Sequence, residues 1–210
     1  GVELVADVTA HEDMKLRMLN GTHSALAYTG YLAGHETIAD TVADPDFAIY
    51  VRALWSEIAP AVTAPQGVSL TDYADALMDR YANRAIRHRT WQIAMDGSQK
   101  LPQRLLGTVR DNLDAGRPVK GLCTAIAAWM RYVSGTDEAG QPIDVRDPMA
   151  DRLRTMAQSQ DDPAEIVASL LSVEDIFPAD LSDRLQGPVS QAAAVIWQDG
   201  VRAAIKGSVR

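Results

Sequence analysis

Three polar side chains, those of Lys15, Asn20 and His23, are of the types that act on a hydroxyl or carbonyl group. The pattern of residues 14–34 predicts a helix, and at about 100° per residue His23 lies about 80° and Asn20 about 140° round from Lys15. The three side chains therefore share one arc, with His23 between the other two. A solvated helix face would show the same spacing, so spacing alone leaves a reactive site and an ordinary surface both open.

Oxidation of a secondary alcohol needs a base that takes the hydroxyl proton, and the reverse reduction needs an acid that returns it. A free lysine has a pKa of about 10.4 and is a poor base at neutral pH, so a lysine base has to be desolvated or placed beside another cation. Asn20 can donate an amide N–H to an oxygen that gains negative charge. His23 can orient the substrate oxygen or influence the charge of Lys15, and the sequence does not separate these roles.

A second group of polar residues follows the corner formed by residues 96–98. Pro102 is tolerated in the first turn of a helix, and Lys100 and Arg104 stand close to that expected helix start. Backbone N–H groups at a helix N-terminus, together with two cations, favour an anion such as a carboxylate. The alternative is a pair of solvated basic residues, which the spacing fits equally well.

These residues must be positioned by helices, because apolar residues recur at three- and four-residue intervals from about Glu12 onward. Gly34, Gly116 and Gly135 stand where helix stop signals belong. Outside residues 2–8 no convincing alternating run occurs, so we expect an all-α domain over residues 12–210. The further helices that the pattern predicts cover residues 71–81, 84–95, 102–115, 120–134, 148–158, 163–171 and 187–205.

Composition limits the classes of function. The chain has 210 residues, 47% of them hydrophobic, which is enough for one substantial core. A net charge of −8 argues against a nucleic-acid or anionic-membrane surface, and no apolar run approaches the roughly 20 residues of a membrane span. Cys123 is the single cysteine, so no internal disulfide can form. Residues 1–13 lack the pattern of a signal peptide, and we expect a cytoplasmic location.

The sequence provides no clear cofactor or metal motif. The four histidines are scattered, without an HExxH or paired CxxC pattern, so no metal site is expected. Neither a GxGxxG motif nor a P-loop occurs, so a nicotinamide cofactor would be bound mainly by a domain outside this chain. Residues 2–8 have a short β-type pattern. We therefore expect residues 1–11 to be a linker or last strand from an upstream cofactor domain, and this chain to be part of a longer protein.

Two long segments, residues 14–34 and 88–104, resemble the C-terminal domain of the polyol-specific long-chain dehydrogenases, the family of mannitol 2-dehydrogenase and fructuronate reductase. Supporting similarity runs through residues 28–40, 127–137 and 143–148. The second long segment looks closer to the fructuronate reductase branch. The resemblance implies a multi-helix substrate domain with a fold like that of the C-terminal domain of 6-phosphogluconate dehydrogenase.

The resemblance also implies roles for individual residues. The lysine matching Lys15 is the general acid/base of a metal-independent mechanism in this family, and the asparagine matching Asn20 stabilises the oxyanion. His23 fits a residue that hydrogen-bonds and orients the substrate oxygen. The matching DGS-x-K segment makes Lys100 a candidate substrate contact, with Arg104 and Arg89 as weaker candidates.

The leading hypothesis is therefore a substrate-binding, catalytic-base domain of an NAD-dependent oxidoreductase. By resemblance, the reaction interconverts a 2-keto sugar or uronate, such as fructose or fructuronate, with mannitol or mannonate. The partners would be a small sugar, polyol or uronate and the protein's own N-terminal Rossmann domain, without which this chain would be inactive. The competing hypothesis is a non-catalytic all-α module that binds a ligand or another protein. The sequence leaves the substrate and the choice between NAD and NADP open.

Overall fold

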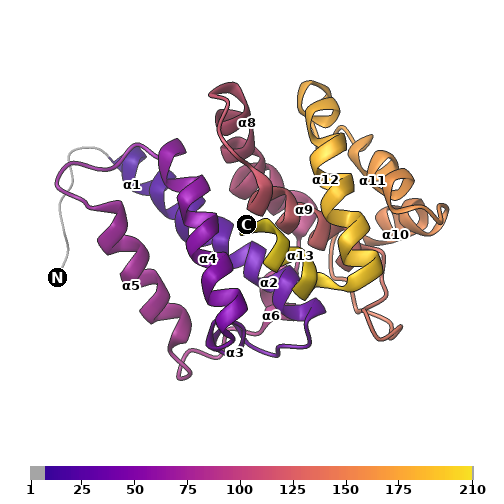
Figure 1. Ribbon diagram of the computed structural model, residues 1–210, viewed down its shortest axis with the longest axis horizontal. Helices are drawn as coiled ribbons and strands as arrows, with labels where there is room; N and C mark the ends of the chain where they lie inside the picture. The colour runs from indigo at the N-terminus through magenta and orange to yellow at the C-terminus, as the bar shows by residue number, and fades with distance from the viewer. Residues whose placement is uncertain (1–7, 210) are drawn as a thin grey trace.

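The computed structural model describes residues 8–209, and this part of the chain folds almost entirely as helices (Figure 1). Among these residues no strand is present, and the β pairing is limited to two isolated bridges, Thr37 with Arg89 and Thr136 with Pro142. The predicted all-α fold is therefore confirmed. Within the same described range, no helix is long and apolar enough to cross a membrane.

Residues 8–32 form one continuous helical segment in which a π-helix separates two α-helices. Its parts are α1 (Val8–Met14), the π-helix η1 (Lys15–Gly21) and α2 (Thr22–Leu32). Because no glycine or proline stands between Val8 and Gly21, the helix extends further towards the N-terminus than predicted. Residues 8–11, which we expected in a linker or strand, are thus helical. The rest of the predicted extended segment, residues 1–7, lies outside the described residues.

The remaining helices follow in chain order and are separated by turns. They are α3 (Ile38–Ala43), α4 (Pro45–Ile58), the 3₁₀-helix η2 (Ala59–Ala61), α5 (Leu70–Ala82), α6 (Thr90–Ala94), α7 (Gly97–Leu101), the π-helix η3 (Pro102–Leu106), α8 (Gly107–Asp114), α9 (Lys120–Val133), α10 (Ala150–Gln158), α11 (Pro163–Leu171), α12 (Ala179–Asp199) and α13 (Val201–Ser208). Most of the predicted helices match these bounds closely.

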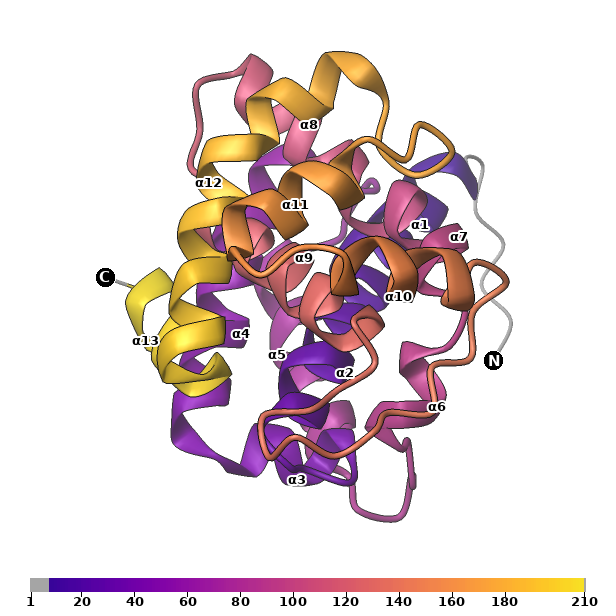
Figure 2. The same cartoon turned by 90° about the vertical axis from the view of Figure 1, so that its right-hand side faces the viewer.

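Helix α9 is the centre of the packing. Every residue of α9 except Lys120 and Arg131 is buried, as expected for a helix that is apolar all round. It contacts α2 and α4 on the N-terminal side and α10, α11, α12 and α13 on the C-terminal side. Figure 2 shows α9 enclosed between these two groups of helices. The core therefore joins the N-terminal and C-terminal parts of the chain into one body.

The buried N-terminus of α9 is capped by a carboxylate from another helix. Its own N-cap residue, Val119, has no side-chain acceptor, and Glu57 of α4 accepts hydrogen bonds from the backbone N–H groups of Gly121 at 2.8 Å and Leu122 at 3.0 Å. The hydroxyl of Tyr50, also on α4, donates to the carbonyl of Gly121 at 2.9 Å. Helix α4 thereby fixes the end of the central helix, where unpaired N–H groups would otherwise be buried.

The predicted stop signals are correct. Gly34, Gly116 and Gly135 all have positive φ angles, of 83°, 65° and 83°, and each follows the end of a helix. These are left-handed conformations that glycine adopts without the steric cost of a Cβ atom. The helices α2, α8 and α9 consequently end close to the residues that the sequence indicated.

Two predicted helices are wrong in their extent. Most of residues 84–95 is not helical, because this backbone pairs with the backbone of residues 36–38. The N–H of Ile38 donates to the backbone carbonyl of His88 at 2.9 Å, and the N–H of Thr90 donates to the backbone carbonyl of Glu36 at 3.0 Å. Only α6 forms there. The helix predicted for residues 187–205 starts earlier, at Ala179, and breaks at Gly200, whose φ is 85°.

Glu57 should make the stability of the fold depend on pH. Burial raises the pKa of Glu57, although the backbone N–H groups of α9 lower it, so the folded state binds this proton more tightly than the unfolded chain. Its contribution to stability is therefore complete below the usual glutamate pKa and is lost as the pH rises through the raised value. We predict that, as the pH rises from the usual glutamate pKa through the raised pKa of Glu57, the free energy of unfolding of the wild type falls relative to that of Glu57→Gln. Urea titrations at a series of pH values measure this difference.

Parallel curves for the two proteins would contradict this role of Glu57.

At one fixed neutral pH, Glu57→Ala should lower the free energy of unfolding by about 1–3 kcal/mol, because it leaves buried N–H groups of α9 unpaired.

Candidate active site

Two of the three predicted reactive residues, Lys15 and Asn20, lie on a π-helix instead of an α-helix, and His23 follows on α2. Residues 15–21 form η1, in which hydrogen bonds span five residues. The angles calculated for an α-helix therefore do not apply, and Lys15 and Asn20, which are five positions apart, come closer to one face than the expected separation of about 140°. Short π-helical turns inside α-helices are frequently found at functional sites.

Gly21 ends this π-helix at a close contact with a second one. A Cβ atom at Gly21 would lie 2.7 Å from the backbone carbonyl oxygen of Arg104, in η3. An alanine would therefore force the two backbones apart. The close approach of another backbone explains why a glycine stands inside this long helical segment.

Lys15 and Asn20 point away from the core. Lys15 is exposed and Asn20 is half-buried, and within residues 8–209 neither side chain takes part in any hydrogen bond or ion pair. The two functional groups are therefore available to a ligand. Among the described residues, nothing buries Lys15 in the way that a lysine base requires.

His23 lies just inside this surface and is held between two rings. Its ring centroid lies 5.1 Å from that of Tyr81 and 5.0 Å from that of His88. Burial, followed by the positive charges of His88 and Arg104, lowers the pKa of His23 to about 3. Its Nε2 atom is buried and has no hydrogen-bond partner in the described structure. His23 is thus neutral at physiological pH and can still make one hydrogen bond.

Lys100 and Arg104 are brought beside the same helix. The guanidinium of Arg104 donates to the hydroxyl of Ser24 at 3.0 Å, next to His23. The ammonium of Lys100 donates to the carbonyl of Met95 at 2.5 Å. Burial lowers the pKa of both basic groups, and for Lys100 the charge of Arg104 adds to this effect. These two cations are therefore partly desolvated, which strengthens their attraction for an anion.

The helix N-terminus expected beside these cations is not free. Residues 97–114 form one continuous helical segment, α7, η3 and α8, so Pro102 lies within it instead of starting it. Because proline has no N–H group, it interrupts the α-helical hydrogen bonds where η3 begins. At the true N-terminus, Asp147 accepts from the backbone N–H of Ser98 at 2.7 Å and from its hydroxyl at 2.6 Å. Only side chains therefore remain for an anionic ligand.

Arg89 lies in a different groove. Its guanidinium is 3.7 Å from the carboxylate of Glu36. It lines a cavity of about 370 Å³ together with Tyr31, His35 and Trp91, and none of the other predicted site residues lines this cavity. The role of Arg89 as a substrate contact stays a prediction.

Several neighbours of His23 were not predicted as site residues. His88 and Tyr81 pack on its ring, and the charge of Arg80 lowers the pKa of both His23 and His88. These residues lie about sixty positions from His23 in the sequence, so no local spacing could have grouped them with it.

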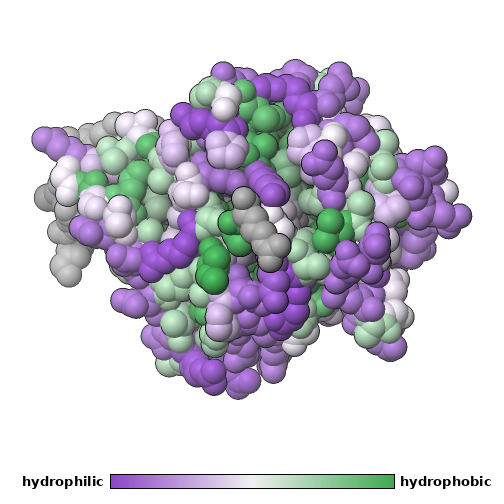
Figure 3. All heavy atoms as spheres, viewed as in Figure 1, coloured by the Kyte–Doolittle hydropathy of each residue, from purple (hydrophilic) through white to green (hydrophobic). Residues whose placement is uncertain are grey.

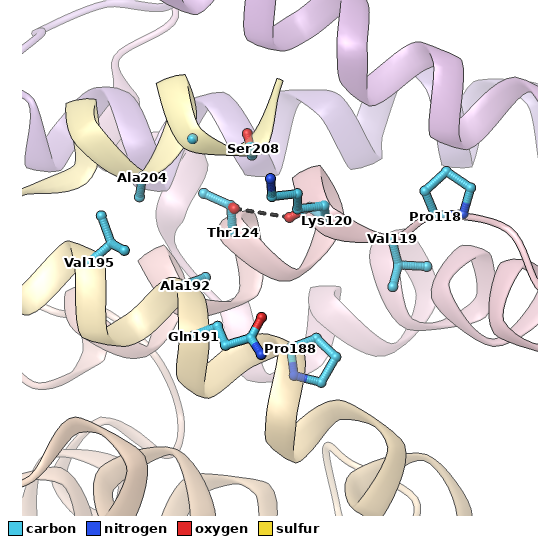
Figure 4. Close-up of a pocket in the computed structure, with 11 residues that line it drawn as sticks. Pro118, Val119, Lys120, Thr124, Pro188, Gln191, Ala192, Val195, Ala204 and Ser208 are labelled. Atoms are coloured by element: carbon cyan, nitrogen blue, oxygen red, sulfur yellow. Dashed lines mark hydrogen bonds between the residues drawn. The ribbon is translucent and has the colours of Figure 1, made fainter. Parts of the chain in front are cut away.

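Other features of the structure do not add to this site. Within residues 8–209, no three histidine, cysteine, aspartate or glutamate residues gather as metal ligands would. Cys123 is buried, and burial raises the pKa of its thiol to about 12, so it is not a nucleophile. A groove of about 470 Å³ lies between α9, α12 and α13, with Lys120 and Thr124 among its few polar residues (Figure 4). None of the predicted site residues lines it.

Comparison with known proteins gives a family match over most of the chain. Residues 7–197 match the family described as the mannitol dehydrogenase C-terminal domain. The chain is 49% identical over 206 residues to D-mannonate oxidoreductase of Escherichia coli (strain K12), and 36% identical over 211 residues to mannitol 2-dehydrogenase of Phaeosphaeria nodorum. These alignments cover 96% and 98% of this chain but 42% and 36% of the relatives. The chain thus spans less than half the length of the curated relatives that it matches.

A solved structure has the same fold. The mannitol 2-dehydrogenase of Pseudomonas fluorescens, in a ternary complex with NAD and D-mannitol, superposes with a TM-score of 0.91 and 33% sequence identity. The superposition covers 99% of this chain and 42% of that chain. With the sequence match over residues 7–197 and the helical fold in agreement, the chain belongs to the mannitol dehydrogenase C-terminal domain family.

Proposed function

We propose that this chain is the substrate-binding, acid/base-bearing domain of an NAD-dependent oxidoreductase that interconverts a 2-keto sugar or uronate with the corresponding alcohol. The observation that carries this proposal is the placement of a free lysine and a free amide on one π-helical turn, beside a half-buried and neutral histidine. Membership of the mannitol dehydrogenase C-terminal domain family supports the reaction type.

The cofactor belongs mainly to another part of the protein. The described residues contain no glycine-rich turn after a strand that could hold a pyrophosphate, so we assign none of them to the nucleotide. NAD, bound by an upstream Rossmann domain, would supply or accept the hydride. The same domain would cover Lys15 and supply the burial that a lysine base requires.

Each residue of the site then has one task. In the reducing direction, Lys15 gives its proton to the carbonyl oxygen of the substrate, and in the oxidising direction it takes the hydroxyl proton back. Asn20 donates an amide N–H to the same oxygen as that oxygen gains negative charge. His23 orients the substrate oxygen. Because His23 is neutral, it does not act as a second cation beside Lys15.

A negatively charged substrate is the better fit. Lys100 and Arg104 are partly desolvated cations on one helical segment, and Arg104 is attached to α2 beside His23. A carboxylate on the substrate could accept charge-assisted hydrogen bonds from both. The 49% identity to D-mannonate oxidoreductase, whose name specifies a sugar acid, supports the same preference.

The cytoplasmic location of the protein remains an expectation from the sequence.

The first test removes the acid/base. Lys15→Ala in the full-length parent protein should lower kcat for the reduction of D-fructuronate, D-tagaturonate or D-fructose by about 10²–10⁴-fold, because a positioned proton donor contributes that much. The rate of NADH oxidation measures the effect. Lys120→Ala, at an exposed lysine that lines the separate groove between α9, α12 and α13, is the matched control and should keep wild-type activity. Equal activity of the two variants would leave the non-catalytic binding module as the better explanation.

The second test concerns the charge of the substrate. Lys100→Met should lower kcat/KM for the two uronates by about 10–100-fold, the equivalent of about 1.5–3 kcal/mol for a hydrogen bond to a charged group. The value for uncharged D-fructose should change much less. Competition between D-fructuronate and D-fructose in one NADH assay measures this ratio. An equal loss for both substrates would show that Lys100 acts on folding and not on the carboxylate.

A further inference from the structure

The π-helix η1 contains a second basic residue that is held very differently from Lys15. The guanidinium of Arg17 pairs with three acceptors, each on a different element: Asp13 on α1 at 2.7 Å, the carbonyl of Ala61 on η2 at 3.2 Å, and Asp111 on α8. Its side chain is only 19% exposed. Arg17 is therefore a fixed point between η1 and three neighbouring parts of the fold.

The other contacts of η1 come from buried side chains. The indole N–H of Trp55 on α4 donates to the carbonyl of Met18 at 3.3 Å, and the hydroxyl of Tyr81 on α5 donates to the carbonyl of Leu19 at 2.8 Å. These donors pair with carbonyl groups in the middle of the π turn. Together with Gly21 they fix the second half of η1, and Arg17 is the anchor nearest to Lys15.

A π turn needs such anchors, because the α-helix is the more common conformation for an ordinary run of residues. If residues 15–21 relaxed to α-helical geometry, Lys15 and Asn20 would move apart around the helix axis. Three acceptors in a fixed arrangement suit the planar guanidinium of arginine, whose donors point in fixed directions. The ammonium of lysine carries a single charge centre and cannot reach all three.

We propose that Arg17 is a positioning residue for the reaction: it holds the π-helical conformation of η1 and thereby keeps Lys15 and Asn20 on one face. This inference rests on the proposed function. Arg17 does not touch the substrate, and it acts by fixing the backbone from which the acid/base projects. A displacement of about 1 Å at a reacting group can lower a rate by about 10²-fold, so a modest relaxation of η1 is enough to be measured.

The test compares two arginines that both pair with α8. Arg17→Met and Arg17→Lys break the anchor of η1, whereas Arg184→Met breaks the 2.7 Å ion pair between α12 and Asp114, the last residue of α8, which does not involve η1. All are made in the full-length parent protein, with Asp111→Asn as a milder second variant that keeps the side-chain volume. Kinetic constants for D-fructuronate, amide hydrogen exchange of residues 15–21 and melting temperature are measured for each.

We expect Arg17→Met to lower kcat by about 10–100-fold with KM changed less than about threefold, and Asp111→Asn to lower kcat in the same direction by less. Exchange of residues 15–21 should become at least tenfold faster in Arg17→Met. Arg17→Lys should not restore the rate. Arg184→Met should leave kcat, KM and exchange in residues 15–21 at wild-type values.

Wild-type kcat and exchange in Arg17→Met would overturn the inference, as would an equal loss of kcat in Arg184→Met. Because exchange is measured without turnover, the result is informative even if the proposed reaction is wrong. Loss of activity in Lys15→Ala with normal activity in Arg17→Met would reject the role of Arg17 alone. An unchanged rate in Lys15→Ala with fast exchange in Arg17→Met would reject the proposed function alone.

Discussion

The candidate site depends on one close contact between two backbones, where Gly21 meets the carbonyl oxygen of Arg104. One of the two segments carries Lys15, Asn20 and His23, and the other carries Lys100 and Arg104. Both segments contain a π turn at this point of contact. Because no side chain larger than hydrogen fits between them, the distance between Lys15 and the basic pair of Lys100 and Arg104 is set by backbone packing.

The rest of the fold makes this contact rigid. Helix α9 is buried on all sides and packs against α2, so the helix that carries His23 rests on the centre of the core. Glu57 caps α9, and Trp55 on the same α4 helix pairs with η1, so one helix supports both the core and the site. The outer surface is mixed, with hydrophobic residues exposed between hydrophilic ones in the middle of Figure 3. Lys15 lies at the surface and Asn20 is half-buried, whereas Trp55 and Tyr81, which bond to η1, are buried.

The sequence predicts the framework well and the site only in part. The apolar run of α9 and the stop signals at Gly34, Gly116 and Gly135 predict their structures correctly, because burial and left-handed backbone are local requirements. The π turn at residues 15–21 was not predictable, since it uses the same residue types as an α-helix and its carbonyl groups pair with distant donors such as Tyr81.

Other differences have the same origin. Residues 84–95 contain helix-forming residues, yet their backbone pairs with residues 36–38, a contact that no periodicity reveals. The neutral state of His23 arises from burial and then from the charges of His88 and Arg104, which are remote in the sequence. The helix expected to start at Pro102 starts earlier, and Asp147 occupies its true N-terminus at Ser98. In each case the local sequence identified the type of residue but contained no information about the residue that it contacts in the fold.

The central claim is that Lys15 transfers the proton although this part of the chain leaves it exposed. A crystal structure of the full-length parent protein with NAD and the substrate alcohol tests this claim most directly. The account predicts that Nζ of Lys15 lies about 2.6–3.2 Å from the reacting hydroxyl oxygen, covered by the nucleotide-binding domain, with the amide of Asn20 on the same oxygen. A substrate bound elsewhere, with Lys15 still in solvent, would contradict it.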